Sequence, residues 1–175
     1  RVGLIIFTDR VERFVPPKKG KKHVLRVITE ILTYTPVSRA TDLRVGLEYL
    51  GKIARRRSVA FLVSDFLADG WAHSLRVVGR KHDLVPVVIS DPMEEQLPPL
   101  GIVCFEDFES GHVLEFDTGG PERREYEARV KRASDERAQL LRRMSMDFVN
   151  VRTDRAYVDA LVAFFRARAR RMRHG

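Results

Sequence analysis

Three short apolar runs of this 175-residue chain each end in a hydroxyl residue followed by an aspartate. The pairs are Thr8-Asp9, Ser64-Asp65 and Ser90-Asp91. Carboxylate and hydroxyl oxygens are hard ligands of the kind that Mg²⁺ and Mn²⁺ prefer. The pairs are therefore candidate ligands for a divalent cation, which would either hold a binding partner or activate water for hydrolysis.

The runs that precede these pairs predict the strands that must position them. Residues 2–8, 59–64 and 84–90 are rich in β-branched or aromatic side chains and do not alternate with polar residues, which is typical of strands buried on both faces. Helical segments lie between them, so we expect parallel strands whose carboxyl ends share one edge of a sheet. Ligands bind at that edge in open α/β sheets. The sequence thus predicts an α/β fold with a mostly parallel sheet.

Two helices are expected between the first two runs, after a short return strand at residues 11–15. The first covers residues 23–34, and its inward face is predicted from apolar residues at helical spacing: Val24, Val27, Ile28, Ile31 and Leu32. The second follows Thr41-Asp42 and is expected to bury Leu43, Leu47, Leu50 and Ile53. Thr41 suits the N-cap of this helix, and Asp42 suits its first turn.

The remaining elements complete a single predicted domain over residues 1–175. A helix from Trp71 should end at Gly79, and a hairpin of strands 102–106 and 113–117 should turn at residues 109–111. A long charged helix is expected over residues 122–144, then a strand over residues 148–151. A final helix should begin near Arg155, and its buried residues are expected to be Tyr157, Leu161, Phe164 and Phe165.

Composition narrows the class of protein. Hydrophobic residues make up 44% and charged residues 32% of the chain, as in globular domains, and the lone Cys104 is expected to be buried and inert. The net charge of +8 raises the question of nucleic acid. However, the arginines are dispersed along helices, and residues 18–22 form the one compact basic patch. Nucleic-acid binding is therefore not the favoured function.

The motifs of common enzymes are missing from the sequence. There is no Gly-x-Ser-x-Gly elbow, Walker phosphate loop or Gly-x-Gly-x-x-Gly, and the five histidines lack metal-ligand spacing and are expected to be surface or hydrogen-bonded structural residues. No nucleophile, general base or phosphate-binding loop is therefore identifiable, and the residues alone leave a binding protein and two alternatives open. One alternative is a magnesium-dependent hydrolase that uses Asp9, Asp65 and Asp91. Another is a metal-free basic surface module that binds nucleic acid or anionic lipid.

Several segments together resemble the von Willebrand factor A-like domain. They are residues 3–11, Thr41-Asp42-Leu43 and the segment from Phe61 to Phe66. More specifically, the chain resembles bacterial proteins of domain-of-unknown-function family 58. His82-Asp83-Leu84, Ser90-Asp91-Pro92 and Thr153-Asp154 add to the likeness, which covers nearly the whole chain.

The resemblance implies a Rossmann-like, three-layer fold with a metal-ion-dependent adhesion site. In that family, three loops hold Mg²⁺ or Mn²⁺: an Asp-x-Ser-x-Ser loop, a threonine that maps to Thr41, and an aspartate that maps to Asp65. Asp42 and Ser64 adjoin these two residues and would support them. Such a cation is left short of negative ligands, so a carboxylate of a partner protein completes its coordination.

One part of the family pattern is missing, because no Asp-x-Ser-x-Ser occurs in this sequence. The chain begins at what would be the second strand of the family, without the central first strand and its helix. We therefore expect this chain alone to bind divalent metal weakly or not at all. We also expect exposed sheet edges, through which the chain would self-associate.

The resemblance also implies a cellular role. It suggests an adaptor, a binding protein and not an enzyme, that works with a MoxR-type AAA+ ATPase in the assembly or activation of other proteins. The expected location is the cytoplasm, where the chain would form the cytoplasmic domain of a membrane-anchored protein. Any membrane contact would then come through regions outside this chain.

Overall fold

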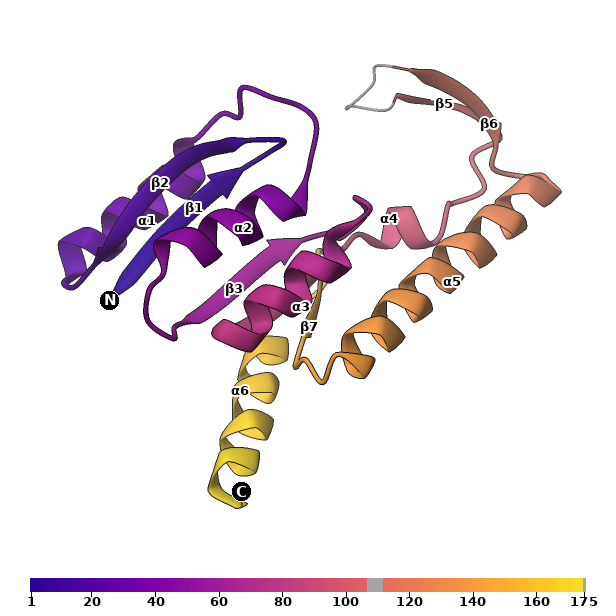
Figure 1. Ribbon diagram of the computed structural model, residues 1–175. Helices are drawn as coiled ribbons and strands as arrows, with labels where there is room; N and C mark the ends of the chain where they lie inside the picture. The colour runs from indigo at the N-terminus through magenta and orange to yellow at the C-terminus, as the bar shows by residue number, and fades with distance from the viewer. Residues whose placement is uncertain (107–111, 175) are drawn as a thin grey trace. The chain divides into compact units, whose positions relative to one another are not determined.

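The computed structural model describes residues 1–106 and 112–174, which form a mixed α/β structure with seven strands and six helices (Figure 1). The chain divides into two compact units. Unit 1 comprises Arg1–Ser58 and Leu67–Asp83, and unit 2 comprises Val59–Phe66 and Leu84–Gly175. The predicted turn at residues 109–111 lies outside the described residues.

Unit 1 is built on an antiparallel hairpin of β1 (Val2–Phe7) and β2 (Val11–Lys18). The predicted return strand is confirmed, and it continues beyond residue 15 through two prolines. Proline lacks an N–H group, so it is tolerated on a strand whose outer edge is unpaired. β1 belongs to this two-stranded sheet and not to the parallel sheet, and it is only partly buried, which corrects the expectation for the first run.

Two helices of unit 1 bury apolar faces that the sequence predicts, except that Leu50 and Ile53 are only half-buried. The helix α2 (Leu43–Ile53) contacts both strands of the hairpin, and Leu43 and Leu47 are fully buried. The helix α3 (Trp71–Lys81) packs on α2 and buries Trp71, Leu75 and Val78. The prediction that α3 ends at Gly79 is wrong. A glycine inside a helix costs only about 1 kcal/mol, and the burial of the preceding turns outweighs that cost.

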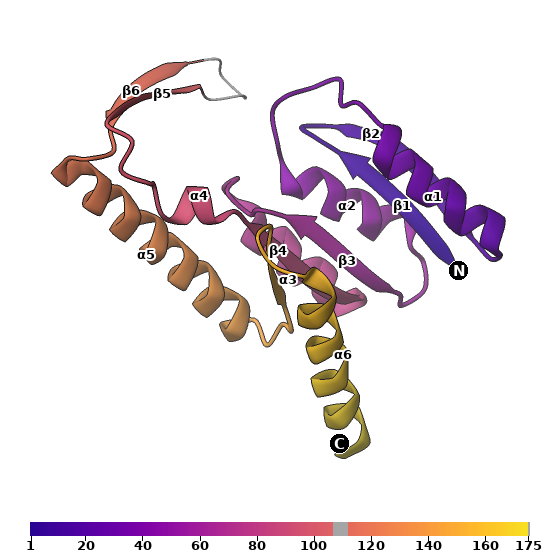
Figure 2. The same ribbon diagram turned by 180° about the vertical axis from the view of Figure 1, so that it is seen from behind.

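The helix α1 (Lys21–Thr33) forms where a helix is predicted, but its predicted inward face is wrong. It lies along the hairpin (Figure 2) and buries one residue, Val27. The other four residues of the predicted core face are exposed: Val24, Ile28, Ile31 and Leu32. The side of α1 that meets the hairpin instead carries polar residues that pair with it.

Unit 2 contains the parallel sheet, with strand order β3-β4-β7. The strands are β3 (Val59–Ser64), β4 (Asp83–Ser90) and β7 (Val149–Arg152), and β4 pairs with β7 in register from Val87↔Val149. The central strand β4 is buried along most of its length, as predicted. The edge strand β3 is not, because its alternate residues Val59, Phe61 and Val63 are exposed.

The rest of unit 2 comprises a short helix, a second hairpin and two long helices. The elements are α4 (Pro92–Glu95), β5 (Ile102–Glu106), β6 (Val113–Asp117), α5 (Pro121–Arg143) and α6 (Tyr157–His174). Cys104 is exposed, against expectation, because the two-stranded hairpin leaves its side chain uncovered. Tyr157 and Phe165 of α6 are also exposed, because α6 meets the sheet mainly at the short strand β7.

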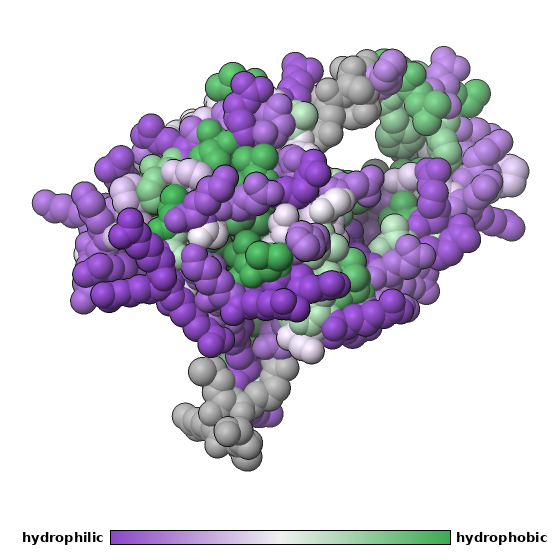
Figure 3. Space-filling view, in the orientation of Figure 1, coloured by the Kyte–Doolittle hydropathy of each residue, from purple (hydrophilic) through white to green (hydrophobic). Residues whose placement is uncertain are grey.

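The surface seen in Figure 3 is mostly hydrophilic, with smaller apolar areas between charged side chains. Among the described residues, no helix combines the length and the apolar character needed to cross a membrane.

Candidate functional site

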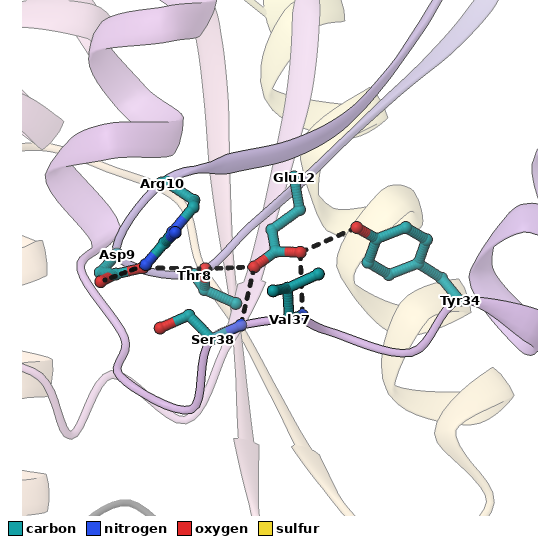
Figure 4. A network of polar contacts seen from close by, with 7 residues as sticks. All are labelled: Thr8, Asp9, Arg10, Glu12, Tyr34, Val37 and Ser38. Atoms are coloured by element: carbon teal, nitrogen blue, oxygen red, sulfur yellow. Dashed lines mark hydrogen bonds and ion pairs between the residues drawn. The ribbon is translucent and has the colours of Figure 1, made fainter.

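The hairpin end of unit 1 carries a dense polar cluster around Glu12 (Figure 4). One oxygen of the Glu12 carboxylate accepts hydrogen bonds from the Thr8 hydroxyl at 2.8 Å and the Ser38 N–H at 3.0 Å. The other accepts from the Tyr34 hydroxyl at 2.8 Å and the Val37 N–H at 3.0 Å. Glu12 therefore ties the loop after α1 to the strand hairpin, and this loop leads to Thr41.

The electrostatics of this cluster favour ionised carboxylates. The Val37 and Ser38 N–H groups lower the pKa of Glu12 to about 2. The side chains of Arg10 and Ser38 lower the pKa of Asp9 to about 2. Groups that hold their protons so weakly are poor general bases at neutral pH, so the cluster is suited to holding the loop and not to proton transfer.

Sequence reasoning missed Glu12 entirely. Its partners in the loop lie 22 to 26 residues further along the chain, and no motif links them. The signal for Glu12 that the sequence offered was a charged residue near the start of a predicted strand. Asp9, by contrast, lies in the turn between β1 and β2, where its carboxylate pairs with Arg10 at 3.0 Å.

The two residues before α2 have different roles from those predicted. Asp42 is the N-cap, and its carboxylate accepts a hydrogen bond from the Arg44 N–H at 2.9 Å. The Arg44 guanidinium pairs with the same carboxylate at 2.7 Å and lowers the pKa of Asp42. Thr41 lies one residue earlier and is exposed, so the prediction that it caps the helix is wrong. The helix begins at Leu43, which places Asp42 in the capping position.

Ser64 and Asp65 form a tight turn at the carboxyl end of β3. The Ser64 hydroxyl lies 3.2 Å from an oxygen of Asp65 and accepts the Phe66 N–H at 3.0 Å. Phe66 is buried with a φ of 59°, a left-handed conformation that is costly for a bulky residue. Arg137 of α5 donates to the Asp65 carbonyl oxygen at 3.1 Å. A strained, buried residue thus fixes the backbone at Asp65.

Asp91 lies at the end of β4 and caps α4. One carboxylate oxygen accepts the Met93 N–H at 2.8 Å, and the Thr153 hydroxyl donates to the other. The Thr153 contact is the main reason that the pKa of Asp91 is lowered. The Thr153 N–H also bonds to the Ser90 carbonyl oxygen at 3.1 Å. Within unit 2, the polar ends of β4 and β7 therefore meet.

These contacts bear on the predicted metal ligands. Both oxygens of Asp42 contact Arg44, whereas the Thr41 side chain is exposed. Thr41 belongs to unit 1 and Asp65 to unit 2, and their shared role as metal ligands stays a prediction. Within residues 1–106 and 112–174, no three or more His, Cys, Asp or Glu side chains are grouped so that they could hold a metal ion.

One histidine differs from expectation. His82 is buried, and neither ring nitrogen has a hydrogen-bond partner within the described part of the chain. Burial away from water lowers the pKa of His82 and keeps the ring neutral.

The model of the family described as "Protein of unknown function DUF58" matches residues 1–137 of this chain. The chain belongs to the DUF58 family. No solved structure matches it.

Mycobacterial relatives of this DUF58 chain carry the description "Uncharacterized protein". Protein Mb1516 of Mycobacterium bovis and protein Rv1480 of Mycobacterium tuberculosis are each 29% identical over 173 residues, which cover 97% of this chain and 55% of each relative. Protein MAV169 of Mycobacterium avium is 27% identical over 159 residues, which cover 89% of this chain and 94% of that protein. The chain thus spans about half the length of the first two.

Proposed function

We propose that this DUF58 chain is a protein-interaction module, an adaptor and not an enzyme. The observation that carries the proposal is the outer side of β3 in unit 2. β3 is an edge strand with no strand neighbour on one side among the described residues. Its side chains Val59, Phe61 and Val63 are exposed, and Phe61 makes an edge-to-face contact with Phe165 of α6 at 5.9 Å. An apolar surface beside an unpaired edge suits a strand from another chain.

The contrast with β2 strengthens this proposal. β2 is also an edge strand, but it carries Pro16, Pro17 and Lys18, which are residues that block pairing with another strand. β3 contains no proline and no charged residue. Unlike β2, β3 therefore carries no residue that blocks pairing, and a second copy of the chain would be one partner, in line with the expected self-association.

Our proposal extends to the fold and the metal. The chain would be a von Willebrand factor A-type domain without its central first strand, and Thr41 and Asp65 would contribute to an incomplete site for Mg²⁺ or Mn²⁺. Asp42 and Ser64 would hold these two residues in place. The exposed Thr41 side chain and the fixed backbone at Asp65 support this assignment. The partner would be a cytoplasmic protein with an exposed carboxylate, and a MoxR-type AAA+ ATPase is the candidate.

Sedimentation velocity over a range of protein concentrations tests the interaction surface. We expect the wild type to self-associate and Val63→Lys to remain monomeric, because a lysine on the β3 face would place a charge in the interface. Val77→Lys is the matched control, since Val77 on α3 is similarly exposed at 53% against 58% for Val63. A wild type that stays monomeric at high concentration would contradict the self-association.

Calorimetric titration with Mn²⁺ tests the metal assignment separately. We expect weak or no binding by this chain, because the Asp-x-Ser-x-Ser loop is missing from its sequence. Any weak binding should be lost in Asp65→Asn. Binding that is tight, or that survives Asp65→Asn, would show that the proposed ligands are wrong.

A further inference from the structure

Among the helices of the described structure, α1 of unit 1 carries the largest number of exposed large hydrophobic residues. Five aliphatic residues lie on it, with exposed fractions from 39% to 78%: Val24 39%, Leu25 53%, Ile28 46%, Ile31 56% and Leu32 78%. Their spacing of three, four and seven residues places them on one side of the helix. Exposed aliphatic side chains gathered in this way mark a binding surface.

The opposite side of α1 is fixed to the hairpin by polar contacts. The His23 ring nitrogen Nε2 lies 2.9 Å from the Val2 carbonyl oxygen. Glu30 accepts two hydrogen bonds from the Arg13 guanidinium, each at 2.9 Å. These contacts, with Val27 buried between them along the helix, set the rotation of α1 about its axis. The helix cannot turn its aliphatic face inward without losing them.

A basic cluster adjoins this face at the N-terminal end of α1. Lys18, Lys19, Lys21 and Lys22 are all exposed. Lys21 lies four residues before Leu25 and seven before Ile28, so it continues the same stripe of the helix. A long lysine side chain at such a position can keep its ammonium group in a polar layer while its carbon chain lies along apolar groups.

We propose that α1 docks on the surface of an anionic lipid bilayer. Its five aliphatic side chains would enter the boundary between headgroups and acyl chains, and the lysine cluster would face the lipid phosphates. An amphipathic helix with basic residues binds at this depth and gains from both terms. This proposal is independent of the β3 surface in unit 2, and either one can fail without the other.

The charge distribution favours a lipid surface over other occupants. A second copy would offer the same lysines and only one acidic residue in its α1, Glu30, which already pairs with Arg13. Nucleic acid would attract the lysines but would leave the five aliphatic side chains in water. A bilayer that contains acidic lipids offers phosphates to the lysines and an apolar layer to the five aliphatic side chains.

Co-sedimentation with vesicles tests the proposal. The probes are vesicles of phosphatidylglycerol and phosphatidylcholine in equal parts and vesicles of phosphatidylcholine alone. We expect the wild type to bind the acidic vesicles much more tightly than the neutral ones. Replacement of the four lysines by glutamine should weaken binding on the order of several hundred-fold, because each lysine near an acidic membrane contributes about five-fold. The triple variant Leu25→Gln, Ile28→Gln, Leu32→Gln should weaken it about as much or more.

Two matched controls separate this surface from general effects. Val37→Gln, Leu100→Gln, Val113→Gln changes three exposed apolar residues elsewhere, and Arg55→Gln, Arg56→Gln, Arg57→Gln removes three other exposed charges. Both should bind within a few-fold of the wild type, and circular dichroism should show that all variants are folded. The proposal is overturned if the wild type does not bind acidic vesicles or binds neutral vesicles equally well. It is also overturned if the aliphatic triple variant binds normally.

Discussion

The helices α1 and α2 of unit 1 both contact the same hairpin, yet they use their apolar residues in opposite ways. α2 turns Leu43 and Leu47 inward, and both are fully buried against the hairpin and α3. α1 buries Val27 alone and leaves Leu32 78% exposed. Both sequences have the spacing of an amphipathic helix, and both would be assigned an inward apolar face by that spacing.

The difference lies in what the hairpin offers to each helix. Phe7 of the hairpin lies so close to Gly46 of α2 that the two elements touch through an apolar contact. Towards α1, the hairpin presents Arg13 and Glu12, which pair with Glu30 and Tyr34. An apolar stripe in a sequence therefore indicates that one face of the helix packs against a partner. It does not indicate whether that partner lies within the same chain.

The largest expected effect comes from truncation of one leucine on each helix. Leu47→Ala should lower the free energy of unfolding by about 3 kcal/mol, since it leaves a cavity in the core. Leu32→Ala should change it by less than about 0.5 kcal/mol, because that side chain is already in water. Urea denaturation of both variants measures the difference. Equal losses would mean that α1 also packs its apolar face in the folded protein.

Replacement of each of the two glycines of α2 by alanine should change the stability by a smaller amount, with opposite signs at the two positions. A Cβ at residue 46 would overlap the Phe7 ring, so Gly46→Ala should destabilise the protein by about 1–3 kcal/mol. A Cβ at residue 51 would lie 3.8 Å from Val78, an ordinary contact, so Gly51→Ala should stabilise the protein by about 0.5–1 kcal/mol. Thermal unfolding of the pair checks this prediction. A harmless Gly46→Ala would show that α2 does not approach β1 closely.

Acid should weaken the polar attachment that holds α1 and its loop. The pKa of Glu12 is about 2 in the folded chain against 4.5 for an ordinary glutamate. A lowered carboxyl pKa stabilises the fold above the unfolded value, and this contribution is lost as the pH falls from about 5 to about 2. Glu12→Gln should therefore lower the Tm at neutral pH, and the difference from the wild type should shrink over that range.

Tyr34→Phe sharpens the same experiment. It removes one of the four donors to Glu12 and leaves the two backbone N–H groups that dominate the lowered pKa. Its effect on Tm should be smaller than that of Glu12→Gln at neutral pH. A variant gap that grows on acidification would mean that Glu12 is not held as an ionised group.

The order and type of most elements could be predicted from the sequence, because strands and helices follow local patterns, but the short helix α4 was not predicted. The strand at residues 59–64 is found with the predicted bounds, and the helix from Trp71 buries the three predicted side chains. Burial was predicted less well. β3 has the composition of a central strand but lies at an edge of its sheet, which depends on the order of strands and not on local sequence.

The candidate sites show the same limit. Asp91 was a candidate carboxylate of the hydrolase alternative, and in the structure it caps α4. Asp42, and not Thr41, caps α2. Adjacent residues with similar capping ability cannot be distinguished from the sequence until the first helical residue is known. Glu12 was missed because its four donors come together only in the fold. Local sequence patterns carry no information about contacts between distant segments.

Hydrogen–deuterium exchange would test most directly that α1 and β3 are two separate binding surfaces. The chain would be measured alone at low and at high concentration, and with vesicles of phosphatidylglycerol and phosphatidylcholine. Vesicles should slow exchange in residues 18–33, and high concentration should slow it in residues 59–64. Exchange that is unchanged in both segments, or that slows in α2 instead of α1, would contradict the assignment.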